Sequence, residues 1–198
     1  MGVITKKYYV LKCMNACKKA ESILQEQEDQ SVIASLAREV LKNCEAMFQL
    51  GDAQAEVYGA ANRIADSLYE HPRLKLKLKM MALKAVKSIE DRDGEEYEEG
   101  AELRKEIEQL ESNIKAADEG RFRDIKSDSV LKKDPVEWTK EFEAVVDEAE
   151  HRAYLQLKGV PRGMGFCFEY WAARRAALKE LGIEWRTPHE MNPRVMFD

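Results

Sequence analysis

Apolar residues recur every three or four positions along most of the chain, which is the spacing of one face of an α-helix. One such face is Ile33, Leu36, Val40, Cys44 and Met47. The expected helices cover about residues 5–27, 31–49, 53–70, 72–89, a stretch from beyond Gly94 to about 118, a stretch from Pro135 to the segment KGVPRGMG, and 166–181. The pattern predicts an all-α fold with roughly 60–75% of residues in helices.

Capping residues fix two of the expected helix ends. Asp134, Pro135 and Glu137 have the order of an N-cap, a first-turn proline and a third-position acid, which predicts that a helix starts there. Gly182 followed by Ile183 predicts a Schellman-type stop for the last long helix.

The segment LKLKLK, residues 74–79, is ambiguous because its strict alternation is a strand pattern. It is only six residues long and leads directly into a helical stretch. Leu74, Leu78 and Met81 also share one helical face, so we expect a helix here.

Changes in polarity divide the chain into three parts. We expect a helical bundle over residues 1–118, a polar linker over 119–134, and a C-terminal helical unit with its tail over 135–198. The bundle includes a short heptad pattern from Leu103 to Ala117. Two heptads are fewer than a free coiled coil needs, so we expect this pattern to pack within the chain, with a dimer contact as the alternative.

Composition and charge exclude some classes of function. The chain has 198 residues and a formal net charge of -5, which argues against broad coating of nucleic acid or of an acidic membrane. No apolar run is long enough to cross a membrane and the start has no secretion signal, so we expect a cytoplasmic protein with no membrane partner. Cys13, Cys17 and Cys44 fall on apolar helical faces, which predicts buried, reduced thiols.

The segment PRGMGFCF, residues 161–168, combines Arg162 with two glycines, Gly163 and Gly165, before a helix. Free amides at that helix start, together with Arg162, would suit an anion. The spacing matches no phosphate-binding loop and no strand precedes it. We therefore expect chiefly a turn that lets two helices pack against each other.

No set of catalytic or metal-binding residues stands out. Cys167 lies in a first helical turn, where a thiol can be activated, but a base would have to come from His151 or His189. Glu148 and His151 form a single Glu-x-x-His pair, whereas a di-iron site needs two. We expect no catalytic residue, no metal and no cofactor.

Arginine and aromatic residues are concentrated in residues 160–198. Guanidinium groups and aromatic faces suit nucleic acid, and they equally suit a protein interface. The other interpretation is a C-terminal tail that only packs on the bundle, through Trp185, Val195, Met196 and Phe197. The candidate binding residues are Arg162, Gly163, Gly165, Trp171, Arg174, Arg175, Trp185 and Arg186.

Three hypotheses for function follow. We expect a cytoplasmic interaction or assembly protein that binds a protein partner or associates with itself. The alternative is an accessory subunit that contacts nucleic acid through the arginine-rich and aromatic segment, and the third is an enzyme with Cys167 as nucleophile. No motif is specific enough to assign a family.

Overall fold

The computed structural model describes residues 5–127 and 130–197. Of the structure, 72% is helical, and the described residues form eight α-helices and no strand. The predicted all-α class is confirmed. Residues 74–79 lie inside one helix, as their helical spacing indicated.

The chain folds as two compact units. The N-terminal unit comprises Met1–Gln27 and Val32–Glu111, and the C-terminal unit comprises Glu28–Ser31 and Ser112–Asp198. The boundary between the two units, at 111–112, lies inside one continuous helix. The change in polarity from which the domains were predicted therefore does not mark it.

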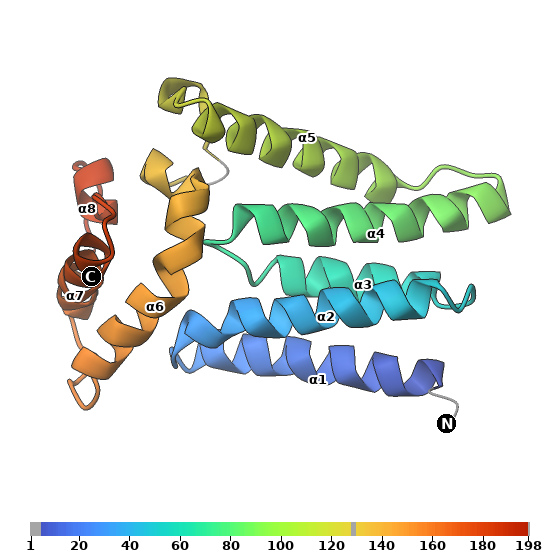
Figure 1. The fold of residues 1–198 in the computed structure, drawn as a ribbon, viewed down its shortest axis with the longest axis horizontal. Coiled ribbons are helices and arrows are strands. Elements are labelled where there is room, and N and C mark those ends of the chain that lie inside the picture. Colours follow the sequence, from blue (N-terminus) through green and yellow to red (C-terminus); the bar gives the residue numbers. More distant parts are fainter. Residues whose placement is uncertain (1–4, 128–129, 198) are drawn as a thin grey trace. The chain divides into compact units, whose positions relative to one another are not determined.

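The N-terminal unit is a bundle of long helices, of which α1 to α4 lie side by side (Figure 1). The unit contains α1 (Lys6–Gln25), α2 (Ile33–Phe48) after the 3₁₀ turn η1 (Gln30–Val32), α3 (Gln54–Ala65), α4 (Pro72–Asp93) and the first part of α5 (Glu98–Asp118). Helix α3 ends earlier than expected, because the chain already turns at Ser67 and Leu68 ahead of Pro72.

Small side chains dominate the core of this unit. Ala20, Ala34, Ala37 and Ala61 are fully buried, and alanine lets neighbouring backbones approach closely. Gly100 likewise lets α5 approach α4 closely, because an added Cβ would lie 2.5 Å from the Glu90 carboxylate of α4.

Lys79 of α4 is buried and cross-links three helices. Its side chain is 2% exposed. Its Nζ lies 2.8 Å from Asn62 Oδ1 and 2.8 Å from Asp66 Oδ1, both at α3, and 2.7 Å from Glu106 Oε2 of α5. An ammonium group has three protons, so these acceptors satisfy the buried cation completely.

The C-terminal unit contains a helix pair and several short turns. Its elements are the last part of α5, the 3₁₀ turns η2 (Phe122–Asp124) and η3 (Pro135–Trp138), α6 (Lys140–Gln156), α7 (Phe166–Glu180) and the one-turn helix α8 (Pro188–Met191). Helices α6 and α7 pack against each other through Phe142, Val146, Ala149 and Leu178.

The predicted start of the sixth helix is wrong by five residues. Asp134 caps the short turn η3 by accepting from the Val136 amide, and Thr139 then caps α6 by accepting from the Phe142 amide. Besides capping η3, the Asp134 carboxylate accepts from Arg186 of the C-terminal segment.

The predicted end of α7 is confirmed. Gly182 has a left-handed φ of 87°, and the Ile183 amide donates to the Leu178 carbonyl over 2.9 Å, as a Schellman motif requires. Thr187 and Glu190 form a reciprocal capping box at α8.

Two buried asparagines hold the segment between α5 and η3. Asn113 donates to the Lys126 carbonyl and accepts from the Lys126 amide, each over 2.9 Å. Asn192 makes the same pair of bonds with Lys132, over 2.8 and 2.9 Å. The predicted polar linker is therefore tied to the C-terminal unit by side-chain bonds to its backbone.

Most of the heptad pattern of α5 is buried within the chain. Leu103, Ile107, Leu110 and Ala117 are each at most 8% exposed, and Leu103 belongs to the core of the N-terminal unit, whereas Ile114 is only partly buried. Within residues 5–127 and 130–197, no helix combines the length and the apolar character that a membrane span requires.

Cys13, Cys17 and Cys44 are free thiols and at most 2% exposed, so the prediction that they are buried is confirmed. Burial raises the pKa of Cys17 to about 11. A hydrogen bond with Cys13 and burial together raise the pKa of Cys44 above its ordinary value. Cys167 is only half-buried.

We expect removal of the acceptors of Lys79 to destabilise the fold more than removal of Lys79 itself. In Lys79→Met, the carboxylates of Asp66 and Glu106 return to water, because they are already 60% and 51% exposed. That variant should lose about 1 kcal/mol or less, whereas Asp66→Asn with Glu106→Gln should lose about 2–4 kcal/mol by leaving a buried cation unpaired. Urea unfolding at pH 7 measures both, and equal losses would contradict this account.

The same site predicts a loss of stability at high pH. Burial lowers the pKa of Lys79, but the hydrogen bonds to Asp66 and Glu106 outweigh burial and hold it above 10.5. A raised folded-state pKa gives stability that is fully present at neutral pH and is lost as pH rises through that pKa. Unfolding curves between pH 8 and pH 12 should show a larger loss in the wild type than in Lys79→Met.

Thiol labelling tests the burial of the cysteines. At pH 7 a thiol reagent should modify Cys167 in the folded protein, while Cys13, Cys17 and Cys44 should react only after unfolding, because all three are buried and the raised pKa values of Cys17 and Cys44 also keep those two thiols protonated. Peptide mass mapping identifies the labelled residue. Rapid native labelling of Cys17 would contradict the structure.

Candidate functional site

The arginines predicted to bind a partner have partners inside the C-terminal unit. Arg174 of α7 is 6% exposed, and its Nε lies 3.0 Å from Oε1 of the buried Glu150 of α6. Its guanidinium also lies 4.8 Å from the ring centre of Trp185 and 5.9 Å from that of Phe142. Tyr170 donates from its hydroxyl to the other oxygen of Glu150. Arg174 therefore helps to join α6 and α7.

Arg186 and Trp185 bind acidic residues at the start of the helix pair. The backbone amide of Arg186 donates to Asp134 over 2.7 Å, and its guanidinium donates to both oxygens of Asp134 over 3.1 and 3.0 Å. This bonding raises the pKa of Arg186. The Trp185 indole donates to Glu137 over 2.8 Å. These bonds fasten the segment after α7 to η3.

Arg175 continues the same network. It donates to the Trp185 carbonyl over 3.2 Å and forms an ion pair with Glu190. Glu190 is also the acid of the α8 capping box. One carboxylate thus serves both the helix cap and the arginine.

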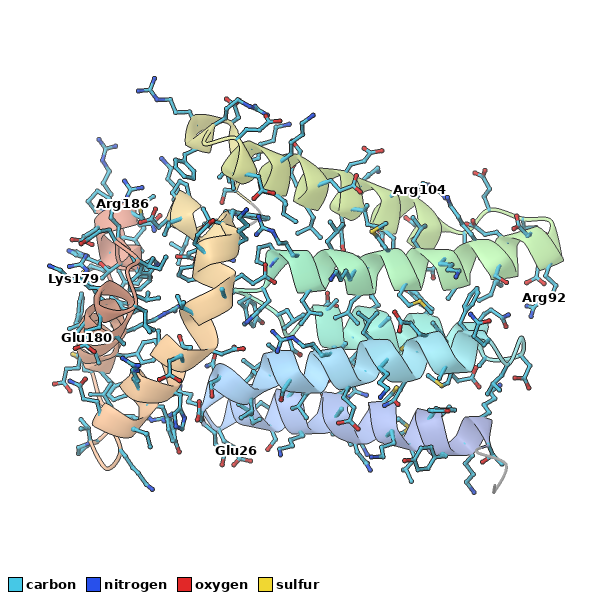
Figure 2. The ribbon with its side chains drawn as sticks, in the orientation of Figure 1. Glu26, Arg92, Arg104, Lys179, Glu180 and Arg186 are labelled. Atoms are coloured by element: carbon cyan, nitrogen blue, oxygen red, sulfur yellow. The ribbon has the colours of Figure 1, made fainter. Side chains whose placement is uncertain are left out.

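These residues surround a cleft of about 680 Å³. Its lining is Phe122, Asp134, Pro135, Val136, Arg175, Lys179, Glu184, Trp185, Arg186 and Glu190. Figure 2 shows the side chains of Lys179 and Arg186 in this unit. The lining contains as many acidic as basic side chains, so the cleft has no excess charge with which to attract phosphate.

Trp171 belongs to a separate cluster of aromatic rings. Its ring centre lies 5.4 Å from that of Phe168 and 5.1 Å from that of Phe197, both edge-on. The His189 ring completes the cluster, 5.7 Å from Phe168 and 6.2 Å from Phe197. Edge-on contacts of this kind favour a fixed arrangement of rings.

Exposed apolar side chains lie next to this cluster in the chain. Phe168 is 43% exposed, Met164 is 94% exposed, and Val195 and Met196 are 40% and 95% exposed. We give the ring cluster together with these exposed neighbours in the chain the name aromatic–methionine surface; it consists of Met164, Phe168, Trp171, His189, Val195, Met196 and Phe197.

The turn before α7 uses two of the amides at the helix start in bonds of its own. Gly165 is the N-cap with a left-handed φ of 84°. The amide of Phe166 donates to the Gly163 carbonyl over 3.1 Å, and that of Phe168 donates to the Gly165 carbonyl over 3.0 Å. Arg162 lies 5.5 Å from the ring centre of Phe166. The geometry is that of a turn, in which Gly165 supplies a conformation that other residues adopt with strain.

The candidate catalytic residues Cys167, His151 and His189 have different interaction partners. His151 bonds through Nδ1 to Asp29 over 2.7 Å, and His189 packs in the aromatic cluster. Neither forms a hydrogen bond with Cys167 in the described part of the chain. Over that same part, no group of three or more His, Cys, Asp or Glu residues is arranged to hold a metal ion.

Sequence reasoning identified the arginines and Trp171 but missed the residues that determine their roles. The partners Asp134, Glu137, Glu150 and Glu190 come from other segments, so local spacing carries no signal for them. The exposed Met196 differs from these partners, because the sequence itself shows a methionine beside an aromatic residue in a polar tail.

Comparisons with protein-family models, with curated proteins and with solved structures found no match to this chain.

Substitution of the two glycines separates backbone strain from crowding. An added Cβ at Gly163 or Gly165 meets nothing within 4 Å, and only Gly165 has a positive φ. Gly165→Ala should therefore lose about 1–2 kcal/mol through strain, while Gly163→Ala should change stability by about 0.5 kcal/mol or less. Urea unfolding of both variants checks this ranking, and the reverse order would contradict the described turn.

Proposed function

We propose that this protein is a non-catalytic interaction protein that binds a protein partner through the aromatic–methionine surface. The observation that supports the proposal is a division of roles in residues 160–198. Arg174, Arg175 and Arg186 pair with carboxylates of their own unit, whereas Met164 and Met196 are almost fully exposed. Exposed apolar groups around a fixed aromatic cluster are typical of a protein-binding surface.

The side-chain chemistry suits a protein partner in particular. Trp171 is half-buried among Phe168 and Phe197, so it is held in place before binding and loses little conformational freedom. Aromatic anchors of this kind often dominate binding energy. The flexible side chains of Met164 and Met196 can adapt to the contours of a partner.

Nucleic-acid binding has less support. Phosphate recognition needs cationic groups that can leave their partners at low cost, and the three arginines bind internal carboxylates. The net charge of -5 further disfavours attraction of a polyanion.

A reducing compartment such as the cytoplasm is part of the proposal. The four cysteines are all described and all free, and three of them are buried in one core. Free buried thiols are ordinary in proteins of reducing compartments.

A pair of charge insertions tests the surface. Met164→Glu with Met196→Glu should leave stability unchanged, because both side chains are at least 94% exposed, and should weaken binding of the partner about tenfold or more. Affinity capture from an extract of the source organism identifies the partner, and calorimetry with the purified partner measures the affinity.

The control carries the same added charge at exposed apolar positions elsewhere in the unit. Val130→Glu with Leu155→Glu should bind like the wild type, since these residues are exposed and lie outside the surface. Equal loss in both double variants would contradict the assigned surface. Salt-dependent binding of a fluorescent single-stranded oligonucleotide, abolished by Met164→Glu with Met196→Glu, would favour nucleic acid instead.

A further inference from the structure

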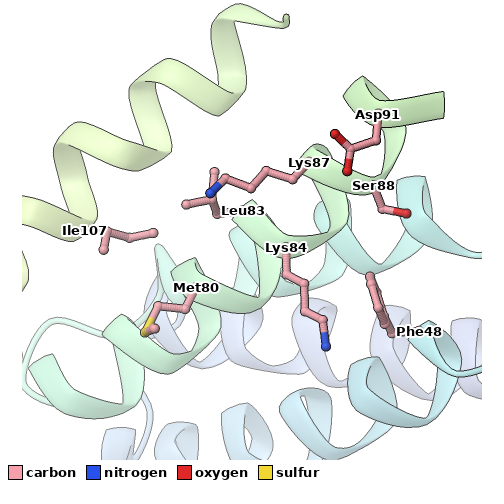
Figure 3. A pocket seen from close by; sticks show the side chains of 8 residues that line it. All are labelled: Phe48, Met80, Leu83, Lys84, Lys87, Ser88, Asp91 and Ile107. Atoms are coloured by element: carbon pink, nitrogen blue, oxygen red, sulfur yellow. The ribbon is translucent and has the colours of Figure 1, made fainter. Parts of the chain in front are cut away.

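A groove runs along α4 in the N-terminal unit. Its volume is about 500 Å³, and it is open to solvent along α4. Figure 3 shows its lining, which consists of Phe48 of α2, Met80, Leu83, Lys84, Lys87, Ser88 and Asp91 of α4, and Ile107 of α5.

The α4 residues of the groove occupy one helical face. From Met80 to Asp91 they follow steps of three and four residues, so the groove extends along about three helical turns, or roughly 16 Å. Its apolar side chains include Met80, which is 48% exposed, and Leu83, which is partly buried against the core. The groove has the length and the open form of a seat for another helix.

Two lysines of the groove have no internal carboxylate partner. In residues 5–127 and 130–197, neither Lys84 nor Lys87 forms an ion pair, although Asp91 lies four residues beyond Lys87. The Lys84 ammonium lies 4.4 Å from the ring centre of Phe48. By contrast, Lys79 of the same helix has all its acceptors inside the bundle.

The charge of α4 is also opposite to that of the chain. The helix contains seven basic and three acidic residues, whereas the whole chain has a net charge of -5. The lining itself has two lysines and one carboxylate, Asp91, beside its apolar side chains, so the groove has a net positive charge. This suits an occupant that is apolar on one face and negatively charged at its edges.

We propose that this groove binds an amphipathic helix of a protein partner whose apolar stripe is flanked by carboxylates. The stripe packs on Phe48, Met80 and Leu83. Carboxylates spaced by three or four residues pair with Lys84 and Lys87, because residues so spaced share a helix face.

The open form of the groove favours a helix over a small carboxylate ligand. Small-molecule sites enclose most of the surface of their ligand, and this groove leaves one long side exposed. A helix buries only one stripe and leaves its polar face in water, which matches such a surface.

The proposal is independent of the aromatic–methionine surface. The two sites belong to different units and have different chemistry, since one is aromatic with methionine and the other is apolar with unpaired lysines. The variant Met164→Glu with Met196→Glu should therefore bind the helix like the wild type, which keeps failure of one proposal distinct from failure of the other.

Designed peptides test the groove on the full-length protein. The probes are four fluorescent peptides of about 18 residues, long enough to form helix, with a leucine stripe in different registers and glutamates at three- and four-residue spacing beside it. A matched set has lysine in place of each glutamate. Fluorescence anisotropy should show binding of at least one acidic peptide, weakened by raising the salt concentration, and no binding of its lysine counterpart.

Charge reversal on the protein locates the binding. Lys84→Glu with Lys87→Glu should weaken binding of the acidic peptide about tenfold or more by replacing attraction with repulsion. The control is Lys18→Glu with Lys19→Glu, which makes the same charge change at exposed positions of α1 and should bind like the wild type. Circular dichroism confirms that each variant is folded.

Three results would overturn the proposal. The first is a failure of every acidic peptide to bind below about 1 mM, which is the weak limit of specific binding. The second is equal binding by the Lys84→Glu, Lys87→Glu variant. The third is saturable binding of dodecanoate in the groove without binding of any peptide, which would identify a lipid carboxylate as the occupant.

Discussion

The C-terminal unit depends on one buried ion pair, Glu150 with Arg174. It joins α6 to α7 where both side chains are out of water, and the rings of Phe142 and Trp185 lie near the guanidinium. Separating a buried pair leaves an uncompensated charge, at a cost of about 3–5 kcal/mol, so the two helices are held in one relative position. The guanidinium of this pair also lies against the ring of Trp185, which donates to Glu137, and the next residue, Arg186, donates to Asp134.

In the N-terminal unit, too, a buried charge holds helices together, but the charge is a lysine. Its core is rich in alanine, which brings backbones close together but buries little apolar area per residue. Lys79 compensates by linking α3, α4 and α5 through its three acceptors. In both units the buried charge serves the fold, and the groups left for binding are those at the surface.

This use of charge reverses the simplest interpretation of residues 160–198. Arginines beside aromatic residues suggest contact with a polyanion or a partner, yet the guanidinium groups of Arg174, Arg175 and Arg186 bind internal acids. The apolar residues carry the proposed contact with a partner instead. In the N-terminal unit, Lys84 and Lys87 form no ion pair within the described residues, and they line the groove on which the second proposal rests.

The sequence by itself determined which segments are helical and where α7 ends, because helix period and the Schellman stop at Gly182 act within a few residues. It also predicted the burial of Cys13, Cys17 and Cys44, since burial follows from the apolar stripe. Only the tertiary structure decided which charges are paired and which are free. Ion pairs such as Asp134 with Arg186 join residues 52 positions apart, and no local pattern specifies such a distance.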